Sequence, residues 1–95
     1  EYLDLPDAEL KQKIYDRIMI RLDQGMITEV ENLHNSGVTW ERLEGFGLEY
    51  RYIAQYLQGN LTRKEMINEL NRATWQYVKR QRTWFKKYVK SPNSN

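Results

Sequence analysis

The sequence predicts an all-α protein: a small bundle of about four main helices that ends in a long, basic C-terminal helix. Three observations predict it. Apolar residues recur at steps of three and four, glycines and prolines divide these runs, and no convincing period-two strand pattern occurs. The 95 residues are 40% hydrophobic and 29% charged, which suits one small domain with a single core.

The first helix is predicted to begin at Pro6 and to end near Gln24. Proline suits a first helical position, and the residue before it is disfavoured in a helix. The expected buried stripe recurs every four residues and consists of Leu10, Ile14, Ile18 and Leu22. Gly25 is a natural C-terminal cap. A second, short helix over residues 26–35 follows and closes at Gly37.

The middle of the chain is predicted to hold one helical turn, a loop and a short helix. Residues 39–44 form the turn, and the Gly-Phe-Gly segment 45–47 interrupts regular structure. Apolar and aromatic residues then recur at helical spacing from Leu48 to Leu57. The glycine at Gly59 stops this helix.

A capping box marks the start of the last helix. Thr62 and Glu65 have the spacing at which a threonine side chain and a glutamate each satisfy a free backbone N–H at a helix start. A long helix follows and runs to about residue 90. The predicted organisation is therefore one helical domain over residues 1–90 and a flexible tail over residues 91–95.

Composition excludes several classes of site. The chain has no cysteine and a single histidine, His34, so neither disulfides nor a histidine cluster can form, and we expect His34 on the surface without a metal. No apolar run approaches the ~20 residues of a membrane span, and the acidic start does not resemble a signal peptide. We expect a soluble, cytoplasmic protein.

The net charge of +2 conceals a strong asymmetry along the chain. Residues 1–50 contain five Lys/Arg and eleven Asp/Glu, whereas residues 51–95 contain ten and two. The two parts therefore have balances of −6 and +8. A polyanion is the partner that such a basic segment favours.

The last helix is predicted to carry six of its cations along one broad face, namely Arg72, Lys79, Arg82, Lys86, Lys87 and Lys90. Seven basic residues and no acid occur from Arg72 onward, namely Arg72, Lys79, Arg80, Arg82, Lys86, Lys87 and Lys90. The opposite face, which we expect to pack against a core, carries Leu70, Thr74, Tyr77, Phe85 and Tyr88. The cations form either a solvated surface or a polyanion site. This stretch contains no acid that could pair with the cations, so they repel one another unless a partner supplies negative charge. The lack of acids therefore favours the polyanion.

Two residues of this helix depart from a simple amphipathic pattern. Gln81 lies at the centre of the predicted apolar face, where a glutamine needs hydrogen-bond partners, so a polar site is expected there. Trp84 lies on the border between the faces. It is either a core residue or a platform on which a base stacks.

Two arginines lie on the apolar stripe of the first helix. Arg17 and Arg21 are in line with its buried residues. They either extend to solvent and pair with acids such as Asp16, Asp23 or Glu29, or point into an anion site. The planar guanidinium suits phosphate oxygens.

Three segments resemble the C-terminal part of tRNA dimethylallyltransferases, also called tRNA isopentenyltransferases. Residues 17–30 (RIMIRLDQGMITEV) are similar to the family's arginine-led helix and Gly-aliphatic-x-x-Glu-Val turn. Residues 46–53 (FGLEYRYI) and 56–59 (YLQG) resemble its Leu-Gly-Tyr-Lys-Glu segment and the Tyr-Leu-x-Gly that follows. Residues 79–86 (KRQRTWFK) resemble its Lys-Arg-Gln-x-Thr-Trp signature.

The resemblance implies an enzyme that transfers a dimethylallyl group from dimethylallyl diphosphate to N6 of the adenosine 3′-adjacent to the anticodon, with Mg²⁺. It implies that Arg17 contacts the diphosphate and that the tRNA anticodon stem-loop is the partner. The residues that it places at the tRNA are Gly47, Tyr50, Arg51, Lys79, Arg80, Gln81, Arg82, Thr83, Trp84 and Lys86. It also accounts for a glutamine between basic residues at position 81.

The chain departs from the family pattern in three ways. It has no Gly-Lys-Ser/Thr phosphate loop and no acidic residue matching the proposed catalytic base, and Glu49 replaces a family glycine. It also starts at Glu1 without a methionine. We therefore expect a C-terminal fragment with no catalytic residue or metal ligand of its own, inactive alone, from an enzyme that is a monomer and whose nucleotide-binding fold and Mg²⁺ site lie in the missing part.

Two alternatives from other classes remain open. A free-standing helical RNA-binding module would use the same basic stripe, with an affinity that falls steeply as salt rises. A helical protein-interaction domain would instead use its acidic first half against a basic partner. The unpaired cations expected from Arg72 to Lys90 argue against the second alternative.

Overall fold

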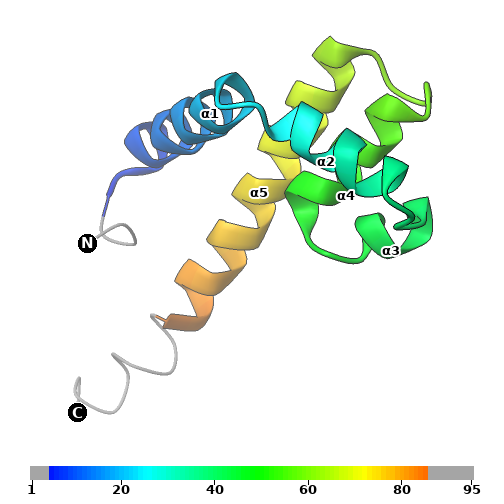
Figure 1. The fold of residues 1–95 in the computed structure, drawn as a ribbon. Helices are drawn as coiled ribbons and strands as arrows, with labels where there is room; N and C mark the ends of the chain where they lie inside the picture. The colour runs from blue at the N-terminus through cyan, green and yellow to red at the C-terminus, as the bar shows by residue number, and fades with distance from the viewer. Residues whose placement is uncertain (1–4, 86–95) are drawn as a thin grey trace.

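The computed structural model describes residues 5–85, with the last two of these described by backbone alone, and all five elements in this part are helices (Figure 1). Their bounds are α1 Asp7–Asp23, α2 Met26–Asn35, α3 Trp40–Glu44, α4 Leu48–Leu57 and α5 Arg63–Phe85. The all-α prediction is confirmed, with four longer helices and the expected single turn as α3. None of these five helices is long and apolar enough to cross a lipid bilayer.

α5 is the helix against which the others are arranged. α2, α3 and α4 gather beside its first half, whereas α1 lies separately along it, and the second half of α5 projects beyond this group (Figure 1). The core lies between α1, the first half of α5 and the α2–α4 group. Its buried hydrophobic side chains are Leu10, Ile14, Ile18, Leu22, Met26, Val30, Leu43, Ile53, Ala54, Met66 and Leu70.

α1 follows the prediction closely. It begins one residue later than predicted, because Pro6 has an extended ψ and serves as the N-cap. The four predicted stripe residues are all buried. Gly25 has a φ of 93°, in the left-handed region that favours glycine, and it separates α1 from α2. The change of direction between these helices depends on this glycine.

The predicted capping box is confirmed at the start of α5. The Glu65 backbone N–H donates to Thr62 Oγ1 at 3.1 Å, and the Thr62 N–H donates to Glu65 Oε1 at 2.8 Å. A second cap stands at Thr39, whose hydroxyl accepts from the Arg42 N–H at 3.2 Å. Local hydrogen bonds thus determine where α3 and α5 begin.

The predicted apolar face of α5 is buried in its first half only. Met66 and Leu70 are fully buried and Thr74 is half-buried, but the Tyr77 side chain is 52% exposed. The expectation that Tyr77 packs into the core is wrong, because its side chain lines the open cleft, whereas the neighbouring Val78 still packs against the core. The Phe85 side chain and Tyr88, expected on the same face, lie outside the described residues. The tail over residues 91–95 lies outside the described residues.

Replacing Thr62 by Ala is expected to lower the free energy of unfolding by about 1 kcal/mol, because the Glu65 N–H loses its acceptor. Urea unfolding followed by circular dichroism measures the loss. Thr28→Ala is the matched control, since Thr28 is exposed and its side chain makes no hydrogen bond within the described residues. Equal losses in the two variants would contradict the capping role.

Candidate substrate and nucleic-acid surface

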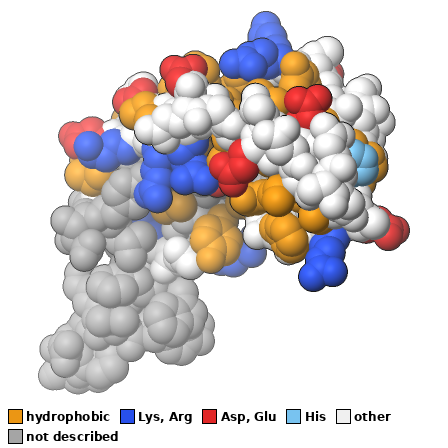
Figure 2. All heavy atoms as spheres, viewed as in Figure 1, with side chains coloured by type: hydrophobic (Ala, Val, Ile, Leu, Met, Phe, Trp, Pro, Cys, Tyr) orange, Lys and Arg blue, Asp and Glu red, His pale blue; other side chains and the backbone are white. Residues whose placement is uncertain are grey.

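An open cleft of about 480 Å³ lies between α1, the loop before α4 and the second half of α5. Its walls are mostly apolar and include Ile14, Phe46, Tyr77 and Val78. Arg17 lines the same cleft. Figure 2 shows hydrophobic side chains exposed on the visible face of the molecule close to basic ones. A cation beside apolar walls suits a ligand with an anionic and an apolar part.

Arg17 and Arg21 have different surroundings, although both lie on the same side of α1. Arg21 Nε is 2.9 Å from a carboxylate oxygen of Glu49, and its Nη2 lies 3.2 Å from the Met26 sulfur. Arg17 is exposed and makes no ion pair or hydrogen bond with a residue of the described part. The pairing interpretation therefore holds for Arg21, with Glu49 as the acid instead of the three expected ones. Arg17 keeps its donors available to an anion.

Gly47 shapes the loop that forms one wall of the cleft. Its φ of 143° and ψ of 177° belong to a region used almost only by glycine, and its carbonyl accepts the first hydrogen bond of α4 from the Arg51 N–H at 2.9 Å. Phe46 meets the Tyr50 ring edge-on, with ring centroids 5.6 Å apart. The glutamate at position 49 fits this arrangement, since it lies in the first turn of α4 and pairs with Arg21.

Tyr50 and Arg51, which the resemblance places together at the tRNA, point to different sides of α4. Tyr50 lines the cleft, and its hydroxyl donates to Glu29 Oε2 at 3.0 Å. This hydrogen bond raises the pKa of Tyr50, and partial burial adds to the effect. Arg51 lines another groove and its Nε donates to the Glu44 carbonyl at 3.4 Å. The structure thus joins Tyr50, but not Arg51, to Arg17 and Gly47.

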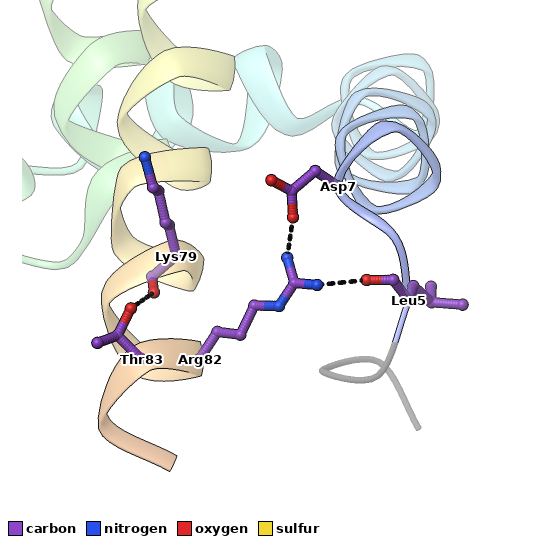
Figure 3. A network of polar contacts seen from close by, with 5 residues as sticks. All are labelled: Leu5, Asp7, Lys79, Arg82 and Thr83. Atoms are coloured by element: carbon purple, nitrogen blue, oxygen red, sulfur yellow. Dashed lines mark hydrogen bonds and ion pairs between the residues drawn. The ribbon is translucent and has the colours of Figure 1, made fainter. Parts of the chain in front are cut away.

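Some signature residues on α5 have side chains that hydrogen-bond within the chain, and others have exposed charges. Lys79 and Arg80 are exposed, and neither side chain makes an ion pair within residues 5–85. Gln81 is also exposed, and its amide donates to the Tyr77 hydroxyl at 2.9 Å. The Thr83 hydroxyl donates to the Lys79 carbonyl at 3.1 Å (Figure 3). The predicted polar partner of Gln81 therefore exists, at the edge of the cleft.

Arg82 differs from these neighbours. Its guanidinium pairs with the Asp7 carboxylate and donates from Nη2 to the Leu5 carbonyl at 2.7 Å, and only 16% of its side chain is exposed (Figure 3). Arg72, at the start of the basic stretch, pairs with Glu69 at 2.7 Å. Of the remaining predicted contacts, the Trp84 side chain and Lys86 lie outside the described residues.

The aromatic residues away from the cleft have structural contacts. His34 is half-buried, its ring stacks on Trp40 with centroids 3.6 Å apart, and its Nδ1 lies 2.9 Å from the Val38 carbonyl. Lys11 Nζ lies 5.1 Å from the Trp75 ring centroid. In the part of the chain that is described, no group of three His, Cys, Asp or Glu could hold a metal ion.

The sequence did not predict that Glu49 and Tyr77 line the cleft, or that Glu29 holds the Tyr50 hydroxyl. It indicates Glu49 only as a departure from a family glycine, Glu29 only as a possible partner of the arginines, and Tyr77 only as a core residue. The one local signal was the tyrosine hydroxyl four residues before Gln81, which matches the hydrogen bond now observed. The other two contacts join residues far apart in the chain.

The family model and the relatives that match this chain indicate the same family. The family model described as IPP transferase matches residues 2–88. The chain is 49% identical over 80 residues to tRNA dimethylallyltransferase 2 of Citrifermentans bemidjiense, covering 84% of this chain and 26% of the relative. It is 54% identical over 76 residues to tRNA dimethylallyltransferase 1 of Geotalea daltonii, covering 80% and 25%. With tRNA dimethylallyltransferase 2 of Treponema denticola it shares 47% over 90 residues, covering 94% and 30%.

The chain thus spans about a quarter of the length of the curated relatives that it matches. No solved structure matches it.

Replacing Gly47 by Ala is expected to destabilise the fold by about 1–3 kcal/mol, because alanine is strained at this φ and ψ. Gly45→Ala is the matched control two residues away. Gly45 has a φ of −86°, and an added Cβ would meet its nearest neighbour at 3.5 Å, an ordinary contact. Thermal unfolding of both variants measures the difference. A Gly45 variant that loses as much as the Gly47 variant would contradict the conformational explanation.

Proposed function

The chain belongs to the IPP transferase family, and we propose that it forms the tRNA-binding C-terminal portion of a tRNA dimethylallyltransferase. The proposed enzyme transfers a dimethylallyl group from dimethylallyl diphosphate to N6 of the adenosine 3′-adjacent to the anticodon. The relatives at about half sequence identity are tRNA dimethylallyltransferases, which supports this proposal. The enzyme is proposed to act as a cytoplasmic monomer on the anticodon stem-loop.

The observation that carries the proposal is the available guanidinium of Arg17 on the wall of a mostly apolar cleft. An allyl diphosphate has an anionic head and an apolar tail, and the cleft offers a surface of each kind. During transfer the bond between the allyl carbon and the diphosphate oxygen breaks while the carbon bonds to N6. Arg17 is proposed to hold the diphosphate and to stabilise the charge that develops on the departing oxygen.

The remaining parts of the reaction are assigned outside the described residues. The described residues do not fit a Mg²⁺ site, because no group of three His, Cys, Asp or Glu among them could hold the ion. The base that takes the N6 proton, the phosphate loop and the Mg²⁺ site are proposed to belong to the rest of the enzyme. Without them, the 95-residue chain is proposed to be inactive.

The exposed cations of α5 are proposed as the tRNA contact surface. Lys79 and Arg80 offer charges that phosphates can neutralise, and Gln81 and Thr83 add neutral polar groups within the next three residues. Gly47 and Tyr50 line the cleft together with Tyr77 and Val78, which directly precede these cations on α5. RNA on α5 and a diphosphate at Arg17 would therefore approach the cleft from neighbouring sides. Trp84 and Lys86 are proposed to extend the same surface, and Arg51 to contact RNA from the other side of α4.

A stand-alone RNA-binding module is the second candidate function. The exposed cations of α5 favour it as well, since they need no catalytic partner to bind a polyanion. The Arg17 cleft distinguishes the two, because a module that only binds RNA has no use for a diphosphate site.

In the full-length enzyme, Arg17→Ala is expected to reduce kcat/KM for dimethylallyl transfer by about ten- to a hundredfold, the loss expected for a charge-assisted hydrogen bond. tRNA affinity is expected to stay unchanged. The matched control is Lys13→Ala, which removes another exposed cation of α1 that does not line the cleft. Transfer assays with purified tRNA measure both. Full activity in the Arg17 variant, or transfer by the 95-residue chain alone, would contradict the proposal.

The double variant Lys79→Gln with Arg80→Gln is expected to weaken tRNA binding and to reduce the slope of log K against log salt by about 1.5–2. Binding titrations at several salt concentrations measure the slope. Arg63→Gln with Lys64→Gln removes the same charge from the exposed start of α5 and is the control. A slope reduced equally by both pairs would point to general electrostatic attraction instead of a site on the second half of α5.

A further inference from the structure

Arg82 differs from the other predicted RNA-contacting residues of α5, because its side chain contacts the start of α1. Both terminal nitrogens of its guanidinium have partners, Asp7 on one side and the Leu5 carbonyl on the other (Figure 3). The side chain is 16% exposed, whereas Arg80, two residues earlier, is exposed and has no ion-pair partner among residues 5–85. The arginine therefore presents its donors to the start of α1 and not to solvent.

The contact between Asp7 and Arg82 lies at the end of α1 that is far from Gly25. The helix joins the rest of the fold through Gly25, and Asp7 lies eighteen residues from that glycine, about 27 Å along a helix axis. Arg17 lies about 12 Å from the same glycine, between this joint and the Arg82 contact. A swing of α1 about Gly25 displaces its far end most, so a contact at that end restrains the angle best.

A second ion pair holds the other end of the helix. Arg21, near the end of α1, pairs with Glu49 of α4. Arg17 thus lies between two charged contacts, one to α4 and one to α5. Its apolar neighbours Ile14 and Ile18 pack toward the core but allow sliding, since apolar contact has no direction.

We propose that Arg82 is a positioning residue whose guanidinium holds residues 5–7 and the free end of α1 against α5, so that Arg17 stays on the wall of the cleft. The role of Arg82 in positioning Arg17 rests on the proposed function, whereas its role in restraining α1 against α5 does not. Arg82 is then not an RNA contact, although it lies within the basic signature.

The acid at the other end of the contact separates these two roles. Removing Asp7 deletes a negative charge near the basic surface, so Asp7→Asn strengthens RNA binding if Arg82 is a phosphate contact that Asp7 competes for. If Arg82 instead restrains α1, Asp7→Asn and Arg82→Gln damage the same restraint and have effects of the same sign.

The test is hydrogen exchange of the backbone amides of residues 8–14 in the full-length protein, measured by mass spectrometry without ligand. Arg82→Gln and Asp7→Asn are each expected to speed exchange by about three- to tenfold, because a charge-assisted contact is lost. The double variant is expected to exchange no faster than the faster single variant, since both remove one contact. The controls are Glu9→Gln, another acid in the first turn of α1, and Arg80→Gln. Both are expected to leave exchange within about twofold of the unsubstituted protein.

Affinity for dimethylallyl diphosphate and for tRNA forms the second readout. Arg82→Gln and Asp7→Asn are expected to weaken diphosphate binding by similar factors. Arg80→Gln is expected to weaken only tRNA binding. Unchanged exchange in both Arg82→Gln and Asp7→Asn, or tighter tRNA binding in Asp7→Asn beside weaker tRNA binding in Arg82→Gln, would overturn the proposal. Absence of diphosphate and tRNA binding in the unsubstituted protein would contradict the proposed function, while the exchange result would still decide the role of Arg82.

Discussion

The arrangement of the whole chain depends on the apolar face of α5 being covered over only half of the helix length. Met66 and Leu70 are fully buried between α1 and the α2–α4 group, whereas Tyr77 is half exposed. Burial of the first half holds the fold together through the hydrophobic effect. In the second half only Trp75 and Val78 still pack against the core among the described residues, and this half forms a wall of the cleft on one side and offers its cations on another.

Ion pairs lie at both ends of α1, and one of them joins the acidic first half of the sequence to the basic second half. Acid from the first half meets base from the second in the Asp7–Arg82 pair, and Arg21 meets Glu49 at the other end of the helix. Exposed ion pairs contribute little to stability, typically about 0–1 kcal/mol. Attraction between α1 and α5 therefore comes from the apolar stripe, and the pairs select one orientation among those that bury it.

Features determined by neighbouring residues could be predicted from the sequence. The capping box at Thr62 and the turn at Gly25 depend on local hydrogen bonds and backbone freedom, so the helix bounds agree to within a residue or two wherever both ends are described. Helical periodicity correctly predicted the stripe of α1. It failed at Tyr77, because periodicity identifies a face of a helix but not whether another element covers it. It also could not identify Glu49 as the partner of Arg21, since the two lie 28 positions apart and meet only through the packing of α1 against α4.

The signature at residues 79–86 illustrates a geometric limit on motifs carried by a helix. Successive residues are rotated by about 100°, so Arg80 and Arg82 project toward nearly opposite sides of α5. One ligand cannot contact every member of such a run. The described members divide accordingly: Arg82 faces the start of α1, and Gln81 bonds to Tyr77 beside the cleft. Lys79 and Arg80 are left exposed. A single turn of α5 can thus hold the helix that carries Arg17 while it offers charge to a polyanion, which would link the position of the anion site to the surface where RNA binds.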